Sequence, residues 1–377
     1  MKKYVTLGEI CKLNMGQSPD SSTYNDNGFG IPFYQGNADF GDIHPVTAHW
    51  CTSPTKIAED GDILISVRAP IGALNIATER CCIGRGLAAI TVDSKIASKD
   101  YIWHMLKSRV TMLQAMGTGS TFKAINKNVL NDMRFLLPTL EEQGEIALNL
   151  SKMDEIIRIC TNLMNRLDLL VKSRFVEMFG NIYTIKHNFP IQHLSDYIDF
   201  LTSGSRGWAK YCVDDGSEWF ITIKNVKDCR ISTDNIQPVN APDNMEAKRT
   251  KVEEGDLLIS ITADLGRTGV VTREIAEHGA YINQHLTCIR LDKTKLIPLY
   301  VAYFMESESG TPQFEAKNQT GVKAGLNFDS IKSLKLLVPP LALQEQFAAF
   351  VEQTDKSKFI AINIKKIIRR VRLNDQF

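Results

Sequence analysis

The feature that most constrains the fold of this chain is an internal repeat. The heptapeptide GDILISV at residues 61–67 recurs as GDLLISI at residues 255–261, which is 194 positions later (255 − 61). The hexapeptide MRFLLP at residues 133–138 recurs as LKLLVP at residues 334–339, which is 201 positions later (334 − 133). Matching blocks in the same order, with an offset that drifts as loop insertions would make it drift, predict two copies of one structural unit.

Each copy ends in a stretch with the periodicity of a long helix. After Pro138 the apolar residues recur in alternate steps of four and three, which is the a/d spacing of a coiled-coil seam. The positions are Ile146, Leu150, Met153, Ile157, Cys160, Met164, Leu167 and Val171. After Pro339 the same rhythm runs through Leu343, Phe347, Phe350, Thr354, Ser357, Ala361, Ile364, Ile368 and Val371.

A single amphipathic rod cannot bury its apolar stripe alone, so each helix needs a partner. We expect the two helices to pack on each other as an antiparallel coiled coil and to set the distance between two globular domains. The alternative is two unrelated surface helices, each packed on its own domain. The basic end of the second helix, residues 365–372, is explained equally by attraction of cations to a helix C-terminus, by contact with DNA phosphate, and by contact with an acidic partner.

Inside each unit the pattern is α+β. Short apolar strands follow the Gly-Asp turns, a second strand region is expected at residues 83–92 and 282–291, and helices are expected at residues 98–116 and 298–305. We therefore predict two similar α/β domains, each with a curved and mostly antiparallel sheet, related by a pseudo-two-fold axis. The predicted boundaries are 1–137 for the first domain, 138–185 for the first helical region, 186–338 for the second domain and 339–377 for the second helical region.

Composition and motifs narrow the classes of function. The chain is 44% hydrophobic and 23% charged with a net charge of +1, which is typical of a globular protein and leaves room for local basic patches. There is no apolar run of membrane-spanning length and no signal peptide, so we expect a cytoplasmic protein whose eight cysteines are reduced thiols. We find no Walker motif, no dinucleotide or S-adenosylmethionine loop, no methyltransferase box, no nucleophile elbow and no metal-ligand spacing. The chain is therefore predicted to be a recognition module with no catalytic or metal site.

Polar loops rich in hydrogen-bond donors stand at corresponding places in both units. Arg, Asn, Gln, Ser and Thr are the side chains that read base edges, and Lys contacts phosphate. In the first unit the candidates for DNA contact are Gln17, Ser18, Gln35, Asn37, Arg68, Arg85 and Lys123. In the second unit they are Ser205, Arg206, Lys224, Asn225, Arg267, Asn283, Gln284, Lys317 and Lys323. Any single one is better explained as a solvated loop residue, and only the repetition in both units favours the group.

The duplicated chain resembles the specificity (S) subunit of type I restriction-modification systems. The resemblance rests on the paired Gly-Asp-(Ile/Leu)-Leu-Ile-Ser segments, on the Pro-x-Leu-x-x-Gln helix entrances, and on residues 170–180 (LVKSRFVEMFG) at the end of the first helix. It implies two target recognition domains that each read one half of a bipartite DNA site, with central and distal conserved helical regions between and after them.

The resemblance also implies the partners. Two methyltransferase (M) subunits would hold S-adenosylmethionine and methylate adenine at N6, endonuclease and translocase (R) subunits would join them, and no cofactor would be held by this chain. Two other readings remain: a complete methyl-transfer enzyme, and a coiled-coil scaffold for protein partners without DNA readout.

Overall fold

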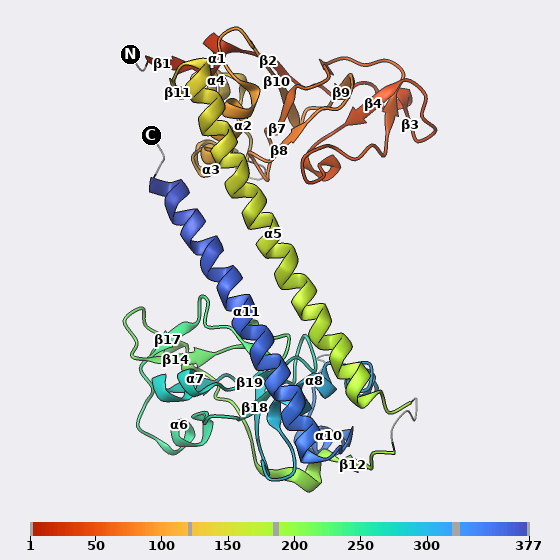
Figure 1. Ribbon diagram of the computed structural model, residues 1–377, viewed down its shortest axis with the longest axis vertical. Coiled ribbons are helices and arrows are strands. Elements are labelled where there is room, and N and C mark those ends of the chain that lie inside the picture. Colours follow the sequence, from red (N-terminus) through yellow and green to blue (C-terminus); the bar gives the residue numbers. More distant parts are fainter. Residues whose placement is uncertain (1–2, 120–122, 184–187, 319–324, 375–377) are drawn as a thin grey trace. The chain divides into compact units, whose positions relative to one another are not determined.

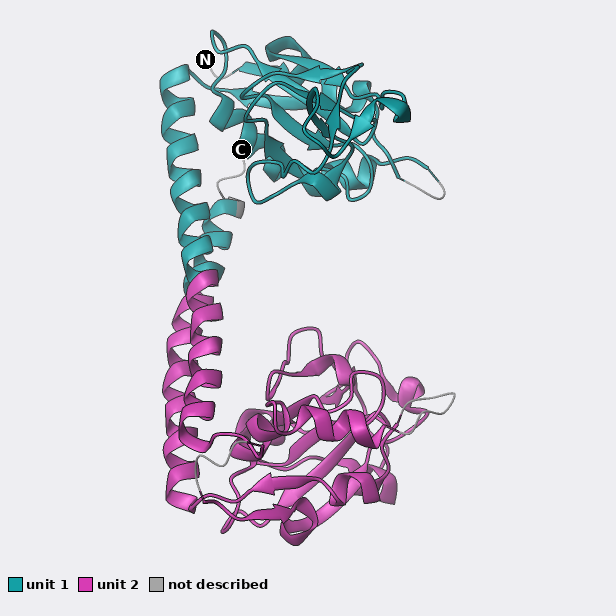
Figure 2. Cartoon of the chain, turned by 90° about the vertical axis from the view of Figure 1, so that its right-hand side faces the viewer, with its two compact units in different colours: residues 1–160, 364–377 teal, residues 161–363 magenta. Residues whose placement is uncertain are grey.

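The computed structural model describes residues 3–119, 123–183, 188–318 and 325–374 (Figure 1). It divides into two compact units, unit 1 (residues 1–160 and 364–377) and unit 2 (residues 161–363), which are coloured separately in Figure 2. Each unit contains one α/β domain and one part of each of two long helices, α5 (Leu140–Phe179) and α11 (Leu341–Asn374). The predicted fold class, two similar α+β domains with two long helices that pack together, is confirmed.

In unit 1 an antiparallel four-stranded sheet carries the domain, with strand order β2-β10-β7-β8. Its strands are β2 (Cys11–Met15), β10 (Leu87–Val92), β7 (Ile63–Ser66) and β8 (Leu74–Ile76). A second sheet has the order β3-β5-β4-β9-β6, from β3 (Tyr24–Asn25), β5 (Trp50–Cys51), β4 (Ile31–Tyr34), β9 (Cys81–Ile83) and β6 (Ile57–Ala58). A two-stranded ladder joins β1 (Lys3–Thr6) to β11 (Arg134–Leu137), and the helices are α1 (Leu7–Ile10), α2 (Lys99–Ser108), α3 (Val110–Met116) and α4 (Lys127–Asn131).

Unit 2 repeats the topology of the four-stranded sheet and has a smaller second sheet. The four-stranded sheet has the order β13-β21-β18-β19, from β13 (Ile198–Ser203), β21 (Leu286–Leu291), β18 (Leu257–Ser260) and β19 (Thr268–Val270). The second sheet joins β17 (Gln237–Val239), β14 (Glu218–Ile221) and β20 (Ala280–Ile282), and the ladders pair β12 (Ile191–His193) with β22 (Lys335–Leu337) and β15 (Val226–Lys227) with β16 (Arg230–Ile231). The helices are α6 (Met245–Thr250), α7 (Arg273–His278), α8 (Pro298–Met305), α9 (Thr311–Lys317) and α10 (Phe328–Lys332).

Three features differ from those predicted. The strand expected at residues 83–92 is two strands, because the chain leaves β9 at Gly84 and enters a different sheet as β10. In each unit the second sheet also contains one parallel pair, β4 with β9 and β14 with β20, so the expectation of one curved sheet was too simple. The helix expected at residues 98–116 breaks at Arg109, which caps the C-terminus of α2 and precedes α3.

A buried glutamine at the entrance of each long helix explains the repeated Pro-x-Leu-x-x-Gln motif. Gln143 and Gln344 are both fully buried, and each side chain accepts a hydrogen bond from a backbone N–H and donates to a backbone carbonyl. The partners are Ser98 and Pro138 for Gln143, at 2.7 and 2.9 Å, and Ile297 and Pro339 for Gln344, both at 2.9 Å. The motif therefore joins the start of each long helix to the loop before α2 or α8, since buried backbone groups need partners.

The two long helices run antiparallel within both units. In unit 2 the ammonium of Lys358 on α11 pairs with Asp168 on α5, and in unit 1 the guanidinium of Arg372 pairs with Asp154. The second pair lies fourteen residues later on α11 (372 − 358) and fourteen residues earlier on α5 (168 − 154). Arg372 at the basic end of α11 is thus held by a carboxylate on α5, which is an explanation that the sequence did not suggest.

On α5 every predicted seam position is buried or half-buried, but on α11 the predicted seam is wrong at several places. The sequence placed Ser357 and Val371 in the seam, and both are exposed. Lys358 and Arg372, one residue later in each case, turn toward α5 instead. Long basic side chains can cover apolar surface with their aliphatic stems while the cation meets a carboxylate, and a search for apolar residues does not detect such a seam.

In unit 2 the C-terminal part of α5 and the start of α11 enter the domain core. Phe175 and Phe179 pack against Tyr300 of α8, with ring centroids 5.7 and 4.7 Å apart, and both also contact Phe347 of α11. Burial of each such aromatic side chain stabilises the fold by about 1.5–3 kcal/mol. No helix in the described part of the chain is both long and apolar enough to span a membrane.

Candidate nucleic-acid interface

Five of the predicted unit-1 residues come together at one end of the unit-1 sheet. The loops after β2, β4 and β7 and the turn before β10 meet there, because antiparallel strands bring the end of one strand beside the start of the next. A cavity of about 210 Å³ opens between these loops, and we name it the unit-1 cavity. Its lining includes Gln35, Asn37, Arg68 and Arg85.

Ser18, the fifth residue, organises one wall of the unit-1 cavity. Its hydroxyl accepts a hydrogen bond of 2.8 Å from Nε2 of Gln35 and one of 3.3 Å from Nε of Arg85. The carboxylate of Asp39 accepts the backbone N–H of Gln35 at 2.7 Å, which fixes the start of this loop. Gln35 and Arg85 are both exposed, so the wall presents an amide and a guanidinium to solvent in a defined arrangement.

Glycines on either side of Arg85 allow this arrangement. A Cβ on Gly86 would lie 2.5 Å from the carbonyl oxygen of Gln35, and a Cβ on Gly84 would lie 2.9 Å from its Cα. Only glycine permits this close approach of the two loops. Arg85 is therefore the one side chain of its tripeptide, and it projects from a tightly packed turn.

The remaining unit-1 candidates lie beside the cavity. Lys123 is exposed, and its carbonyl accepts the N–H of Ala69 at 3.2 Å, next to Arg68. Gln17 is exposed next to Ser18 and uses its backbone carbonyl to accept from Thr55 at 2.5 Å. Gln17 and Lys123 thus lie next to residues of the unit-1 cavity, and the seven candidates include three cations, Arg68, Arg85 and Lys123.

The hydrogen bonds of the backbone identify the equivalent place in unit 2. In unit 1 the N–H of Val67 donates to Gly86, and in unit 2 the N–H of Ile261 donates to His285, at 2.9 and 3.0 Å. The position of Arg85 is therefore taken by Gln284. Isolated bridges pair Arg68 with Ala124 and Thr262 with Gly325, so the position of Arg68 is taken by Thr262.

Thr262, Gln284 and His285 form a connected group, which we name the unit-2 loop cluster. Nδ1 of His285 is 2.6 Å from the hydroxyl of Thr262, and its Nε2 is 3.1 Å from Nε2 of Gln284. Thr262 was not among the polar loop residues identified from the sequence, whereas His285 belongs to the polar stretch 283–285 from which Asn283 and Gln284 were chosen. The repeat held the signal for Thr262, because the offset of 194 that aligns the Gly-Asp strands also aligns Thr262 with Arg68.

Three of the predicted unit-2 residues are buried and engaged within the domain. Ser205 shares a hydrogen bond of 3.1 Å with Thr250, and Asn225 caps its own turn by accepting the N–H of Thr222 at 2.9 Å. Asn283 accepts the N–H of His285 at 3.2 Å. Their exposed fractions are 1%, 6% and 8%, so these side chains offer little surface to a ligand.

The other unit-2 candidates are dispersed. Arg206 and Lys224 are exposed, and Arg206 occupies the position equivalent to Ser18. Arg267 pairs with Asp264 at 2.7 Å, and Lys317 donates to Ser333 at 2.7 Å on α9, away from the loop cluster. Lys323 lies outside the described residues.

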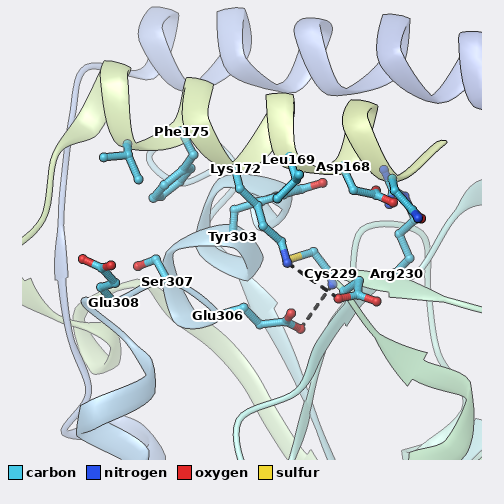
Figure 3. Close-up of a pocket in the computed structure, with 13 residues that line it drawn as sticks. Asp168, Leu169, Lys172, Phe175, Cys229, Arg230, Tyr303, Glu306, Ser307 and Glu308 are labelled. Atoms are coloured by element: carbon cyan, nitrogen blue, oxygen red, sulfur yellow. Dashed lines mark hydrogen bonds and ion pairs between the residues drawn. The ribbon is translucent and has the colours of Figure 1, made fainter. Parts of the chain in front are cut away.

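Unit 2 has a cavity of about 550 Å³, larger than the unit-1 cavity, between α5, α8 and the β15–β16 turn (Figure 3). Glu306 accepts the backbone N–H of Cys229 at 3.2 Å and of Thr268 at 2.7 Å, and Arg230 pairs with Asp168 and Asp355 on the long helices. Burial raises the pKa of the Cys229 thiol, which keeps the thiol protonated. None of the predicted DNA-contacting residues lines this cavity, and its ionic groups are used to attach the domain to α5 and α11.

Comparison with known proteins identifies the family. The family model described as the type I restriction modification DNA specificity domain matches residues 2–169 and 233–370. The chain belongs to this family.

Relatives and solved structures agree with this family. A Methanocaldococcus jannaschii protein named as the specificity subunit of type I restriction enzyme MjaX is 45% identical over 148 residues, which are 39% of this chain and 35% of that protein. The chain thus spans about a third of that relative's length. The specificity subunit of Escherichia coli type I restriction enzyme EcoBI is 18% identical over 93% of this chain and 78% of its own length. The crystal structure of a type I restriction-modification S subunit from M. genitalium matches 99% of this chain and 94% of its own with a TM-score of 0.58 and 14% identity, which shows a shared fold.

Proposed function

We propose that this chain is the DNA-reading subunit of a type I restriction-modification complex. Unit 1 and unit 2 each read one half of a bipartite site in double-stranded DNA. Methyltransferase subunits, two per complex, supply S-adenosylmethionine and methylate adenine at N6, and endonuclease subunits carry out restriction. This chain contributes specificity and no chemistry of its own.

The observation that carries this proposal is the presence of equivalent loops with different side chains. Both units use the same backbone hydrogen bonds to present residues at the same end of the same sheet. The side chains presented are Arg68 and Arg85 in unit 1 and Thr262 and Gln284 in unit 2. A guanidinium reads guanine and an amide reads adenine in the major groove, so the two units are suited to different half-sites.

Exposed apolar stripes on the long helices support the proposal that this chain binds protein partners. Each helix carries, besides its buried seam, a second row of large apolar side chains at heptad spacing. The rows are Ile156, Ile159, Leu163 and Leu170 on α5, and Ile360, Ile364, Ile367 and Val371 on α11, with exposed fractions between 38% and 60%. Such rows are costly in water and are typical of helix surfaces that bind further helices.

The direct test is to map N6-methyladenine in DNA that has been exposed to this chain and its methyltransferase subunit. We expect a single bipartite motif with a spacer of fixed length. A variant with Arg68→Thr and Arg85→Gln should alter one half of the motif and leave the other unchanged. If the methylated motif is the same in both halves, or is continuous, the assignment of one half-site to each unit is wrong.

A matched deletion tests whether the helices set the spacer. Removing residues 155–161 from α5 together with residues 359–365 from α11 takes one heptad from each helix and keeps both the Asp154–Arg372 and Asp168–Lys358 pairs in register. We expect the half-sites to stay the same while the spacer length changes. A methylated motif with an unchanged spacer would show that another part of the complex measures the distance.

A scaffold without DNA readout remains the competing function, and the exposed stripes alone would suit it equally. Gel-shift assays with the methyltransferase subunit present separate the two. A scaffold predicts that the Arg68→Thr and Arg85→Gln changes leave both DNA binding and the methylated motif as they are.

A further inference from the structure

A short helix follows the domain helix in each unit, and the two copies differ at their exposed positions. Residue numbers in α3 and α9 correspond with an offset of 201 (313 − 112), so Met112 matches Gln313 and Met116 matches Lys317. The residue after the first of these is buried in both units, Leu113 in unit 1 and Phe314 in unit 2. The two helices are therefore anchored in the same way while they present different chemistry to the strand beside them.

In unit 2 the helix α9 closes the outer edge of strand β22. The backbone N–H of Lys335 donates to Oε1 of Gln313, and Nε2 of Gln313 donates to the carbonyl of Lys335, both at 2.8 Å. Four residues along, Nζ of Lys317 donates to the hydroxyl of Ser333 at 2.7 Å. The Gln313 amide thus takes the place of a peptide group on a neighbouring strand.

In unit 1 the same edge is open. The N–H of Leu7 donates to the carbonyl of Met133, and bonded and unbonded pairs alternate in an antiparallel ladder, so both backbone polar groups of Arg134 face away from β1. Among the described residues these two groups have no hydrogen-bond partner, because Met112 stands where Gln313 stands in unit 2. An unpaired strand edge is a template for the backbone of another segment.

A cavity of about 760 Å³ lies against this open edge. Its apolar lining includes Tyr4, Met112 and Met116, which are 63%, 38% and 45% exposed. Methionine adapts its shape to varied apolar partners, which suits a binding surface. The cavity therefore combines an apolar floor with the unpaired N–H and carbonyl of Arg134.

The charge at the cavity is basic. Arg109 and Arg134 both line it, and neither forms an ion pair within the described part of the chain. Asp132 is the acidic residue of the lining, and it accepts a hydrogen bond of 3.1 Å from Asn131. An occupant that carries a carboxylate would meet two free guanidinium groups, which bind carboxylates well.

We propose that this cavity binds an extended segment of a partner protein that adds to the edge of β11. The segment supplies to Arg134 the peptide group that the Gln313 side chain supplies to Lys335, rests an apolar side chain on Met112 and Met116, and places a carboxylate against Arg109 and Arg134. β-Strand addition of this kind draws affinity from main-chain hydrogen bonds and selectivity from the pockets beside them. The choice of the methyltransferase subunit as the partner rests on the proposed function.

The test transplants the closure of unit 2 into unit 1. In the full-length variant Met112→Gln with Met116→Lys, the new amide can pair with the backbone of Arg134 and the new ammonium with Asp132, so the cavity closes without loss of the fold. We expect binding of the methyltransferase subunit, measured by calorimetry, to weaken at least tenfold. The reverse variant in unit 2, Gln313→Met with Lys317→Met, is the control and should bind as the wild type does.

Hydrogen exchange gives a second readout that does not depend on the closing variant. In the wild-type chain the amide of Arg134 should exchange fast when free and slowly in the complex, while the amide of Lys335 should be slow in both. The charge-reversal variant Arg109→Glu with Arg134→Glu should also weaken binding at least tenfold, whether or not the closing variant folds.

The possible results separate the explanations. If the wild type binds the methyltransferase subunit and the closed variant binds equally well, this inference is overturned and the proposed function stands. If the wild type fails to bind the subunit at all, both are overturned. If the closed variant instead abolishes a self-association seen by sedimentation of the chain alone, the occupant is a second copy and the assignment to a partner protein is wrong.

Discussion

Unit 1 and unit 2 have similar backbone folds, but the side chains that their equivalent loops expose are different. The entrance glutamines Gln143 and Gln344 make the same hydrogen bonds to equivalent loops, and the two four-stranded sheets have corresponding strand orders. The side chains at equivalent loop positions differ, however. Where unit 1 has Arg85 and Arg68, unit 2 has Gln284 and Thr262. The difference shows that the loop side chains at the end of the sheet can change independently of the scaffold, because their replacement does not disturb its buried hydrogen bonds.

The attachment of each domain to the long helices differs in the same way. In unit 1 the carboxylate of Asp154 on α5 accepts from Lys107 of α2 at 2.9 Å and pairs with Arg372. In unit 2 the equivalent Asp355 on α11 pairs with Arg230 from the β15–β16 turn and with Lys358. One carboxylate position is kept, and the cations that reach it come from different elements.

The largest effect should come from breaking the shared scaffold. Gln344→Ala removes a buried side chain and leaves the N–H of Ile297 and the carbonyl of Pro339 without partners, at a cost of about 3 kcal/mol in the free energy of unfolding. Gln143→Ala should cost a similar amount. Urea denaturation measures both, and Gln346→Ala, an exposed change on α11, is the control and should stay within about 0.5 kcal/mol. Equal stability of the Gln344 and Gln346 variants would contradict a structural role for the motif.

Acid should distinguish the two attachments. Burial is the main cause that lowers the pKa of His104 in α2 to about 4, and its Nε2 lies 2.9 Å from the hydroxyl of Ser151. An unfolded chain binds this proton below about pH 6.5, whereas the folded chain does so only near pH 4. Stability from this group is therefore complete above about pH 6.5 and is lost as the pH falls toward 4, by at most about 3 kcal/mol.

The equivalent residue in unit 2 is Tyr303, whose phenol is protonated throughout this pH range even without the rise in its pKa that burial causes. The measurement is urea denaturation at pH 7 and pH 4.5 for the wild type and for His104→Gln. The variant should lose less stability on acidification than the wild type does. An identical loss in both proteins would mean that other groups carry the acid sensitivity.

A smaller effect is expected where the units differ in recognition. Arg85→Gln copies Gln284 into unit 1 and should lower the methylation rate at the native site about 10- to 100-fold, as the loss of one bidentate base contact does. Arg80→Gln, an exposed change outside the unit-1 cavity, is the matched control. Equal rates for the two variants would mean that Arg85 does not contact a base, and that it contacts either phosphate or no part of the DNA.

The smallest effect should come from loosening the wall of the unit-1 cavity. Ser18→Ala removes the hydroxyl that accepts from Gln35 and Arg85, and these hydrogen bonds are partly solvated. The expected cost in DNA affinity is about 1 kcal/mol, or roughly fivefold. A gel-shift titration with the mapped site measures it, and a loss larger than that of Arg85→Gln would show that Ser18 contacts DNA itself.

The sequence predicted the scaffold better than the recognition surface, for physical reasons. A repeat of apolar strands and Pro-led helices is visible because burial selects residue types strongly at fixed spacing. The seam of α11 was misplaced because Lys358 and Arg372 use their stems as apolar residues do. The turn at Gly84, which separates two strands, has a local signal in Gly84 and Gly86, but the close approach that these glycines allow is to the distant Gln35.

In the loops, residue type alone does not distinguish an exposed side chain that can contact a ligand from a buried one that stabilises its own domain. The polar residues of the first unit are exposed or half-buried in loops at or next to one cavity, whereas Ser205, Asn225 and Asn283 are buried hydrogen-bond partners of their own domain. Ser and Asn side chains satisfy turns and caps as readily as they read bases. Whether such a side chain points inward depends on neighbours far away in the sequence.

The pairing of Arg372 with Asp154 has a consequence for how the protein is made. These residues are 218 positions apart in the chain, and both belong to unit 1. The first domain is synthesised early, but its Asp154–Arg372 contact cannot form until Arg372 has been synthesised. Unit 2, continuous between Thr161 and Asn363, can complete its own fold before that moment. Pairing of Arg372 with Asp154 is therefore a long-range closure, which is the slow kind of step in folding, and a chain without Arg372 would lose this contact within unit 1.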